Sequence, residues 1–289
     1  MSEAPRSTTC FVEGVAFWAP TLPGWAHARL ALRGEAEPLA SPAKRPAPEI
    51  LAAAERRRAP DTVALALEVA AAAVRESGCD AAALPSVFTS THGDLAVNDY
   101  MCTTLASEPA LISPTRFHNS VHNAAAGYWT IATGCHEAST AVTAFDASFG
   151  AGLLEAAAQC CSEARPVLLV AFDVAATGAL ASVTASSGLL ACALVLAPHA
   201  SERTVASIEW SLDPAGAPAT RARSAAARAL AGNAMAGALP LLEAIAAGTA
   251  SAARLALPLS RTMTLSLAVR SLAAAAPAAI SLATTGAPA

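Results

Sequence analysis

The stretch that decides the fold reads Ser113-Pro114-Thr115-Arg116-Phe117-His118-Asn119-Ser120-Val121-His122-Asn123-Ala124-Ala125-Ala126-Gly127-Tyr128. It gathers two histidines, two asparagines and an arginine just before a run of small residues typical of a tightly packed helix. The whole chain of 289 residues has only six histidines and 14% charged residues. Such a concentration of polar side chains indicates a functional segment rather than ordinary surface.

Strands and helices alternate on both sides of this segment, as in α/β proteins. A loop with at most one short helix is expected over 19–48. The runs that predict strands are 8–18, 86–91, 138–144, 166–173, 189–196, 204–212, 255–259 and 262–269. The runs that predict helices are 62–77 (capped by Asp61 and ended by Gly78), 94–106, the segment from 124, 148–161 and 233–247.

The composition excludes several classes of protein. Hydrophobic residues make up 54% of the chain, but no window offers the roughly 18 consecutive apolar residues of a membrane span, and no signal peptide is recognisable. The net charge is −4, and the one basic run, 56–58, has no aromatic neighbours, which argues against nucleic-acid binding. Seven cysteines without a CxxC pair indicate buried thiols in a reducing compartment. We therefore expect a soluble, cytoplasmic protein.

Four local motifs, in order, resemble the N-terminal half of the β-ketoacyl synthase family. They are His92-Gly93-Asp94 after a strand, the 113–128 segment, a strand-to-helix elbow at 143–151 and a closing strand at 188–196. The resemblance covers 9–197. It implies a thiolase-like, layered α/β/α/β/α fold with a complete N-terminal half and a truncated C-terminal half, and dimerisation through the N-terminal half.

The domain organisation follows from the same resemblance. It implies a ketosynthase-like N-terminal domain over 1–200 and a shortened remnant of the C-terminal half over 201–270. The Ala/Pro/Thr-rich tail, 271–289, is expected to be poorly ordered. After residue 197 the only histidine is His199, so the two catalytic histidines of the family are missing. The segment 232–238 resembles the helix start that follows the second of them.

The catalytic cysteine of the family is also missing, since Asp146 stands where it is expected. A thiolate at a helix N-terminus is a good acyl acceptor. A carboxylate there would be stable, but its acyl product is a mixed anhydride that water destroys. The resemblance thus implies no catalytic residue in this chain; a purely structural role of Asp146 as helix N-cap is the alternative.

Chain-length factors lack the same catalytic residues. The sequence of residues 117–123 resembles most closely the corresponding segment in subunits of aryl polyene and related polyketide systems. The resemblance implies a non-catalytic subunit that forms a heterodimer with a complete β-ketoacyl synthase and serves acyl carrier protein indirectly, without metal or organic cofactor. Bulk from residues such as Tyr100 and Met101 would bound the partner's acyl tunnel. The candidates for interface or tunnel are Arg116, Phe117, His118, Asn119, His122, Asn123, Tyr128, Trp129, Asp146 and Ser148.

Three alternatives remain open. A stand-alone thiolase-fold acyltransferase or hydrolase could use Ser148, Ser120 or a cysteine as nucleophile with His118 or His122 as base, although no Gly-x-Ser-x-Gly surrounds either serine. The i, i+4 spacing of the two histidines, followed by 135–136, leaves a zinc site open; interior histidines satisfied by hydrogen bonds explain it too. A degenerate scaffold would bind a partner without affecting product length.

Overall fold

The computed structural model describes residues 8–214, 218–248 and 252–272. The strands are β1 (Thr8–Ala19), β2 (Leu22–Pro23), β3 (Ser86–Thr89), β4 (Ser139–Val142), β5 (Val167–Asp173), β6 (Leu190–Ala197), β7 (Ala206–Asp213), β8 (Ala252–Pro258) and β9 (Thr264–Ser271). The α-helices are α1 (Trp25–Leu32), α2 (Ala53–Arg58), α3 (Asp61–Ser77), α4 (Leu95–Ser107), α5 (Pro114–His118), α6 (Ala124–Thr133), α7 (Ser148–Glu163), α8 (Ala225–Arg228) and α9 (Leu239–Ala246). Short 3-10 turns are η1 (Ala81–Ala83), η2 (Pro109–Leu111), η3 (Phe145–Ala147), η4 (Ala179–Ser182) and η5 (Ala234–Ala238).

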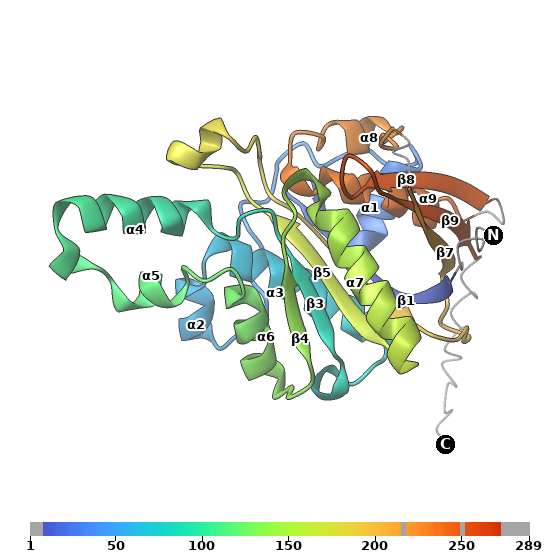
Figure 1. Cartoon of the computed structure of the whole chain (residues 1–289), viewed down its shortest axis with the longest axis horizontal. Coiled ribbons are helices and arrows are strands. Elements are labelled where there is room, and N and C mark those ends of the chain that lie inside the picture. The colour runs from blue at the N-terminus through green and yellow to red at the C-terminus, as the bar shows by residue number, and fades with distance from the viewer. Residues whose placement is uncertain (1–7, 215–217, 249–251, 273–289) are drawn as a thin grey trace, which may run out of the picture.

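Within these ranges the strands form one nine-stranded mixed sheet in the order β4-β3-β5-β6-β1-β7-β9-β8, with β2 paired to β1 (Figure 1). Strands β4, β3 and β5 run parallel, and every pairing from β5 onward is antiparallel. The central strands β5 and β6 are buried at every residue. Such continuous burial requires cover on both faces of the sheet.

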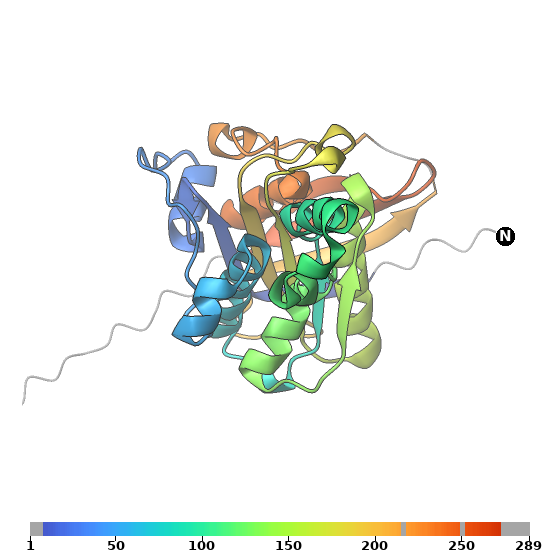
Figure 2. The same ribbon diagram turned by 90° about the vertical axis from the view of Figure 1, so that its left-hand side faces the viewer.

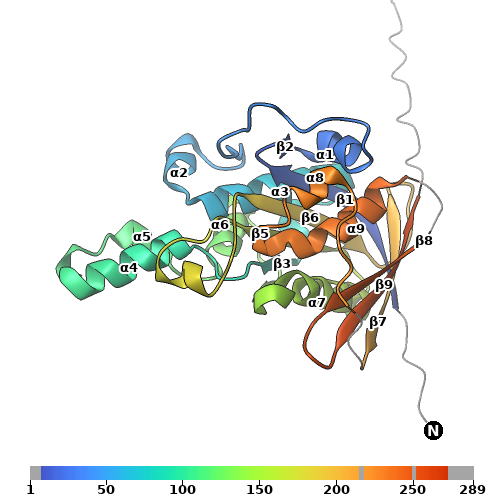
Figure 3. The same cartoon turned by 90° about the horizontal axis from the view of Figure 1, so that it is seen from above.

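Helices supply that cover as two separate hydrophobic cores (Figure 3). On one face α3 and α6 bury residues such as Leu65 and Trp129. On the other face α1, α7 and α9 bury residues such as Leu153 and Leu241. These three layers, α/β/α, are one half of the five-layer arrangement predicted from the sequence. Strands β7, β9 and β8 extend the same sheet.

One glycine sets the close approach of α3 to the sheet. A Cβ atom at Gly14 of β1 would lie 2.1 Å from the backbone oxygen of Ala73 in α3. No real Cβ contact is that short, so only glycine fits without moving the helix. The β1–β6 register shifts between Val12 and Gly14, which places this bulge beneath α3.

The predicted α/β class is confirmed, and the predicted strands and helices form, with local differences. Asp61 is the first residue of α3 and Pro60 its N-cap, so the predicted Asp61 cap is wrong; Gly78 does end the helix, in the left-handed conformation. The helix predicted over 233–247 is divided into η5 and α9. Of the tail predicted over 271–289, Ser271 is the last residue of β9, and the part from 273 onward lies outside the described residues. Among those described, no helix has the length and apolar character needed to cross a membrane.

Candidate functional site

The first part of the polar segment, in α5, lies with α4 in an arm that projects from one end of the sheet (Figures 1 and 2). Ser113 caps α5, since its Oγ accepts a hydrogen bond from the backbone N of Arg116 at 3.4 Å. The Arg116 guanidinium stacks on the Tyr100 ring of α4, 4.1 Å from its centroid. The Tyr100 hydroxyl accepts from Ser113 N at 3.0 Å and donates to the Leu111 carbonyl at 3.3 Å. The arm is thus fixed by its own polar contacts.

The two histidines join this arm to the body of the protein. His122 Nε2 lies 3.0 Å from the Ser90 carbonyl, at the end of β3. The His118 ring meets the Tyr128 ring edge-on, with centroids 5.9 Å apart. Asn119 is buried and donates from Nδ2 to the Thr115 carbonyl at 2.9 Å, while its Oδ1 has no partner among the described residues.

The residues whose spacing left a zinc site open do not come together as metal ligands in the described part of the chain. Within the described ranges, no three His, Cys, Asp or Glu side chains come together in a way that could hold a metal ion. Cys135 is buried with its thiol directed to the Leu84 carbonyl at 3.5 Å, and His136 is exposed. The histidine spacing therefore serves packing and hydrogen bonding in this structure.

The aromatic candidates have different surroundings. Phe117 of α5 is 62% exposed. Tyr128 is half-buried, and Trp129 is fully buried in the core between α6 and the sheet. Asn123 precedes α6 without capping it through its side chain. Phe117 and Tyr128 are thus available to a partner surface, whereas Trp129 stabilises the fold.

The turn between β4 and α7 carries an unusual backbone conformation. Phe145 has a φ of +50°, in the left-handed region that bulky residues rarely adopt. Ser148 Oγ donates to the Phe145 carbonyl at 2.7 Å and accepts from Ala144 N at 2.9 Å, which holds the turn closed. Asp146 is exposed, and Ala147 is the N-cap of α7 without a side-chain bond, so the predicted N-cap role of Asp146 is wrong.

Beneath this turn lies a polar cluster from three other parts of the chain. The His92 ring meets the Phe145 ring edge-on at 5.2 Å, and its Nε2 is buried without a partner among the described residues. Asp173, at the end of β5, accepts from Ser90 Oγ and Thr91 N, each at 2.9 Å. Burial raises the pKa of its carboxyl above the usual aspartate value, although these bonds oppose the shift.

The 232–238 segment reaches the same place. Asn233 Nδ2 donates to the Asp173 carbonyl at 3.2 Å and to the Ser187 carbonyl at 3.1 Å. The turn η5 that follows contacts η3, the turn that holds Phe145 and Asp146. The elbow and the segment resembling the second-histidine helix start are therefore neighbours in space, although about ninety positions separate them in sequence.

The two candidate serines and four of the seven cysteines are not set up for nucleophilic attack. Ser120 Oγ donates to the Phe117 carbonyl at 2.8 Å, and Ser148 is buried in the turn, so neither serine is bonded to a histidine. Burial raises the pKa of the Cys10 and Cys161 thiols, and raises those of Cys160 and Cys192 to about 12. Thiols with raised pKa values carry little thiolate at neutral pH and react slowly.

The α/β/α fold and the strand-to-helix turn define a ketosynthase-like class of protein. The family profile described as "Beta-ketoacyl synthase, N-terminal domain" matches residues 30–263, and the chain belongs to this family. This confirms the family resemblance drawn from the four motifs.

Solved structures share the thiolase-like ketosynthase fold. One is the complex of a ketosynthase with its chain length factor from Xenorhabdus doucetiae: identity is 22%, the TM-score is 0.68, and the match covers 90% of this chain and 99% of that chain. Another is the ishigamide ketosynthase/chain length factor, at 18% identity, TM-score 0.67 and coverages of 91% and 99%. A type II polyketide ketosynthase bound to its acyl-carrier protein matches at 12% identity, TM-score 0.72 and coverages of 92% and 100%. A search of curated protein sequences gives no match.

Two features of the site were not found from the sequence. Phe145, next to Asp146, is the residue at the left-handed apex of the turn. The polar cluster of His92, Asp173 and Asn233 is assembled from strand ends that are distant in sequence. In the sequence, each of these residues lies near the end of a predicted strand or before a predicted helix. Many purely structural residues have the same position, so the pattern does not indicate a site.

Proposed function

We propose that this chain is a non-catalytic subunit of the chain-length-factor type, which forms a heterodimer with a complete β-ketoacyl synthase in polyketide or aryl polyene chain extension. The observation that carries the proposal is the distribution of exposed apolar side chains. Of the twelve large hydrophobic residues that are exposed within the described ranges, eight lie between positions 105 and 183. They are Leu105, Leu111, Phe117, Val121, Ile131, Phe145, Leu180 and Val183.

These eight residues come from α4, η2, α5, the α5–α6 loop, α6, η3 and the η4 region, which gather at one end of the molecule (Figure 2). We call this surface the α4–α6 face. A concentration of exposed apolar residues marks a surface that another protein covers. Next to it, β4 is an edge strand with alternating exposed residues, whose free backbone groups also favour a partner.

The non-catalytic part of the proposal rests on the turn before α7. An aromatic ring at its left-handed apex and a carboxylate after it leave no thiol in the place where the family has its cysteine. In the described structure neither candidate serine is bonded to a histidine base, and burial raises the thiol pKa of Cys160 and Cys192. We therefore favour a partner subunit over a stand-alone acyltransferase or hydrolase.

A groove beside the arm supports the proposed influence on product length. It has a volume of about 640 Å³, and its apolar lining includes Ile50, Leu51, Pro114, Tyr128 and Ile131. In the proposed heterodimer, Phe117 and Tyr128 bound the end of the partner's acyl tunnel from this side. Each methylene excluded there changes the free energy by only about 1–3 kcal/mol, so the side chains would set a preferred length rather than an absolute limit.

The organisation and location complete the proposal. We place the ketosynthase-like unit over residues 1–200, the reduced C-terminal portion over 201–270, and the protein in the cytoplasm, where carrier-protein-bound chains are extended. The ten interface or tunnel candidates keep these proposed roles, except that Trp129 acts from the core and Ser148 acts by closing the turn.

Co-expression with a complete ketosynthase encoded nearby tests the proposal. We expect a one-to-one complex by size exclusion with light scattering. Ile131→Glu should weaken it, because Ile131 is 81% exposed on the α4–α6 face. Met263→Glu is the matched control, since Met263 is 41% exposed on the β8–β9 hairpin and is not among the eight residues of the face. A chain that stays alone with every ketosynthase offered, or a complex that Met263→Glu disrupts as strongly as Ile131→Glu, contradicts the proposal.

A further inference from the structure

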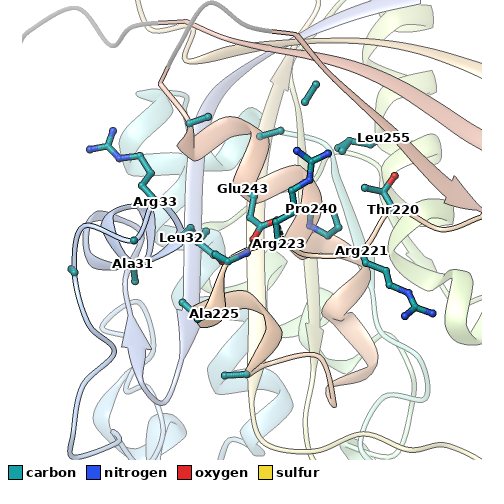
Figure 4. A pocket seen from close by; sticks show the side chains of 18 of the residues that line it. Ala31, Leu32, Arg33, Thr220, Arg221, Arg223, Ala225, Pro240, Glu243 and Leu255 are labelled. Atoms are coloured by element: carbon teal, nitrogen blue, oxygen red, sulfur yellow. Dashed lines mark hydrogen bonds between the residues drawn. The ribbon is translucent and has the colours of Figure 1, made fainter.

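A second cavity lies between α1, the 220–229 segment, α9 and β8, away from the α4–α6 face (Figures 1 and 4). Its volume is about 1000 Å³. None of the ten interface or tunnel candidates lines it, and it has no part in the proposed heterodimer. Because its walls come from four separate stretches of the chain, the cavity depends on the tertiary fold.

The wall is apolar over much of its area. Leu32 and Leu255 are buried side chains that present carbon to the cavity, and Pro240 at the start of α9 lies between them (Figure 4). Alanines from α1, α8, α9 and β8 add to this apolar wall. Such a surface accepts a hydrocarbon chain, as small-molecule sites do in general.

The charged side chains of the lining are mostly positive. Four arginines and two glutamates give a formal charge of +2 (4 − 2) in a chain whose net charge is −4. They are Arg33, Arg221, Arg223, Arg254, Glu37 and Glu243. A basic cavity in an acidic protein attracts an anionic ligand.

Glu243 already accepts hydrogen bonds from the backbone. Glu243 accepts hydrogen bonds from the backbone N of Arg223, at 3.0 Å and 2.9 Å to its two oxygens, and from Ser224 N at 2.7 Å. Figure 4 shows Glu243 between the side chains of Arg33 and Arg221, which extend to opposite sides. Its negative charge is therefore balanced largely by backbone amides instead of by guanidinium groups.

Three of the arginines remain available. Arg33 pairs with Glu35. Among the described residues, the guanidinium groups of Arg221, Arg223 and Arg254 form no ion pair. A phosphate dianion offers three oxygens to such groups, whereas a carboxylate offers two and carries half the charge.

We propose that this cavity binds an organic phosphate carrying an apolar chain, with the phosphate beside Arg223 and Arg254 and the chain against Leu32, Pro240 and Leu255. The site is independent of the ketosynthase-type turn and of the proposed heterodimer. Its failure would leave the proposed function untouched.

Isothermal titration calorimetry of the full chain with octyl phosphate, below its micellar concentration, tests the proposal. We expect saturable one-to-one binding that weakens as salt is added. Octyltrimethylammonium, with a similar chain and the opposite charge, should not bind, and octanoate and inorganic phosphate should each bind at least tenfold more weakly. The double variant Arg223→Gln/Arg254→Gln should lose at least tenfold in affinity, since it removes the charged partners of the phosphate, whose hydrogen bonds are stronger than neutral ones.

The matched control is Arg261→Gln, which removes an exposed arginine from the β8–β9 hairpin outside the cavity. It should leave the affinity unchanged. Binding of the ammonium probe as tight as that of octyl phosphate, octanoate equal to the phosphate, or a double variant that binds normally overturns the proposal. If the double variant does not fold, the probe series and salt dependence on the unmodified chain decide.

Discussion

The left-handed conformation of Phe145 predicts an unusual order of stability among its variants. At most positions alanine is more favourable than glycine by about 0.5–1 kcal/mol, because glycine loses more backbone freedom on folding. At a φ of +50° a non-glycine residue lowers the stability of the fold by roughly 1–2 kcal/mol, because its Cβ crowds the backbone. Glycine has no Cβ and avoids this loss. The difference predicts that Phe145→Gly is more stable than Phe145→Ala by about 1 kcal/mol.

Comparing the two variants removes the contribution of the aromatic ring, since both lack it. The assay is urea denaturation followed by circular dichroism, with the free energy of unfolding extrapolated to water. Ala158→Gly in the helical interior of α7 is the control and should lose about 1 kcal/mol. If Phe145→Ala equals or exceeds Phe145→Gly in stability, the residue is not left-handed and the description of the turn is wrong.

Three further predictions address the core, the buried carboxylate and the thiols. Trp129→Ala should lower the free energy of unfolding by about 3–5 kcal/mol, because the indole is fully buried; a loss below about 1 kcal/mol would instead fit a surface role in the tunnel. Burial raises the pKa of Asp173, so its contribution to stability is greatest below the ordinary aspartate pKa and is lost as the pH rises through the raised value. Asp173→Asn should therefore gain stability relative to the unmodified chain as the pH rises above the ordinary aspartate pKa, and urea titrations showing no such gain would contradict the shift. Iodoacetamide should label exposed Cys102 first and leave Cys10 and Cys160 unmodified, as read by mass spectrometry; rapid labelling of Cys160 would show that its thiol is not held in the raised-pKa state.

Much of the fold could be predicted because its elements carry strong local signals. The apolar run of β5 and the helical spacing in α3 place each of them within one or two residues of the structure. Boundaries were less accurate. Pro60 takes the N-cap position of α3, which moves Asp61 into the helix, where its carboxylate pairs with Arg45 at 3.0 Å. The local sequence did not show that Pro60, rather than Asp61, would take the N-cap position.

For the candidate site, the local elements could be predicted. The strand-to-helix turn forms at the predicted elbow, and the 113–128 segment contains α5 and α6, which contribute to the α4–α6 face. Exposure could not be predicted: Phe117 and Trp129 are both aromatic residues in short helices, yet one is exposed and the other fully buried. The conformation of Phe145 depends on the Ser148 side chain closing the turn, a tertiary arrangement that residue preferences oppose.

The most direct test of the central claim is a chain-extension assay with the purified complex of this chain and its ketosynthase, using acyl and malonyl carrier protein. The account predicts that replacing the nucleophilic cysteine of the ketosynthase by alanine abolishes product. Replacing Cys102 or Ser120 of this chain by alanine should leave the rate unchanged, while Phe117→Ala should shift the product lengths. Product formed by this chain without the ketosynthase, or lost on changing Cys102 or Ser120 in a complex that still assembles, would contradict a non-catalytic subunit.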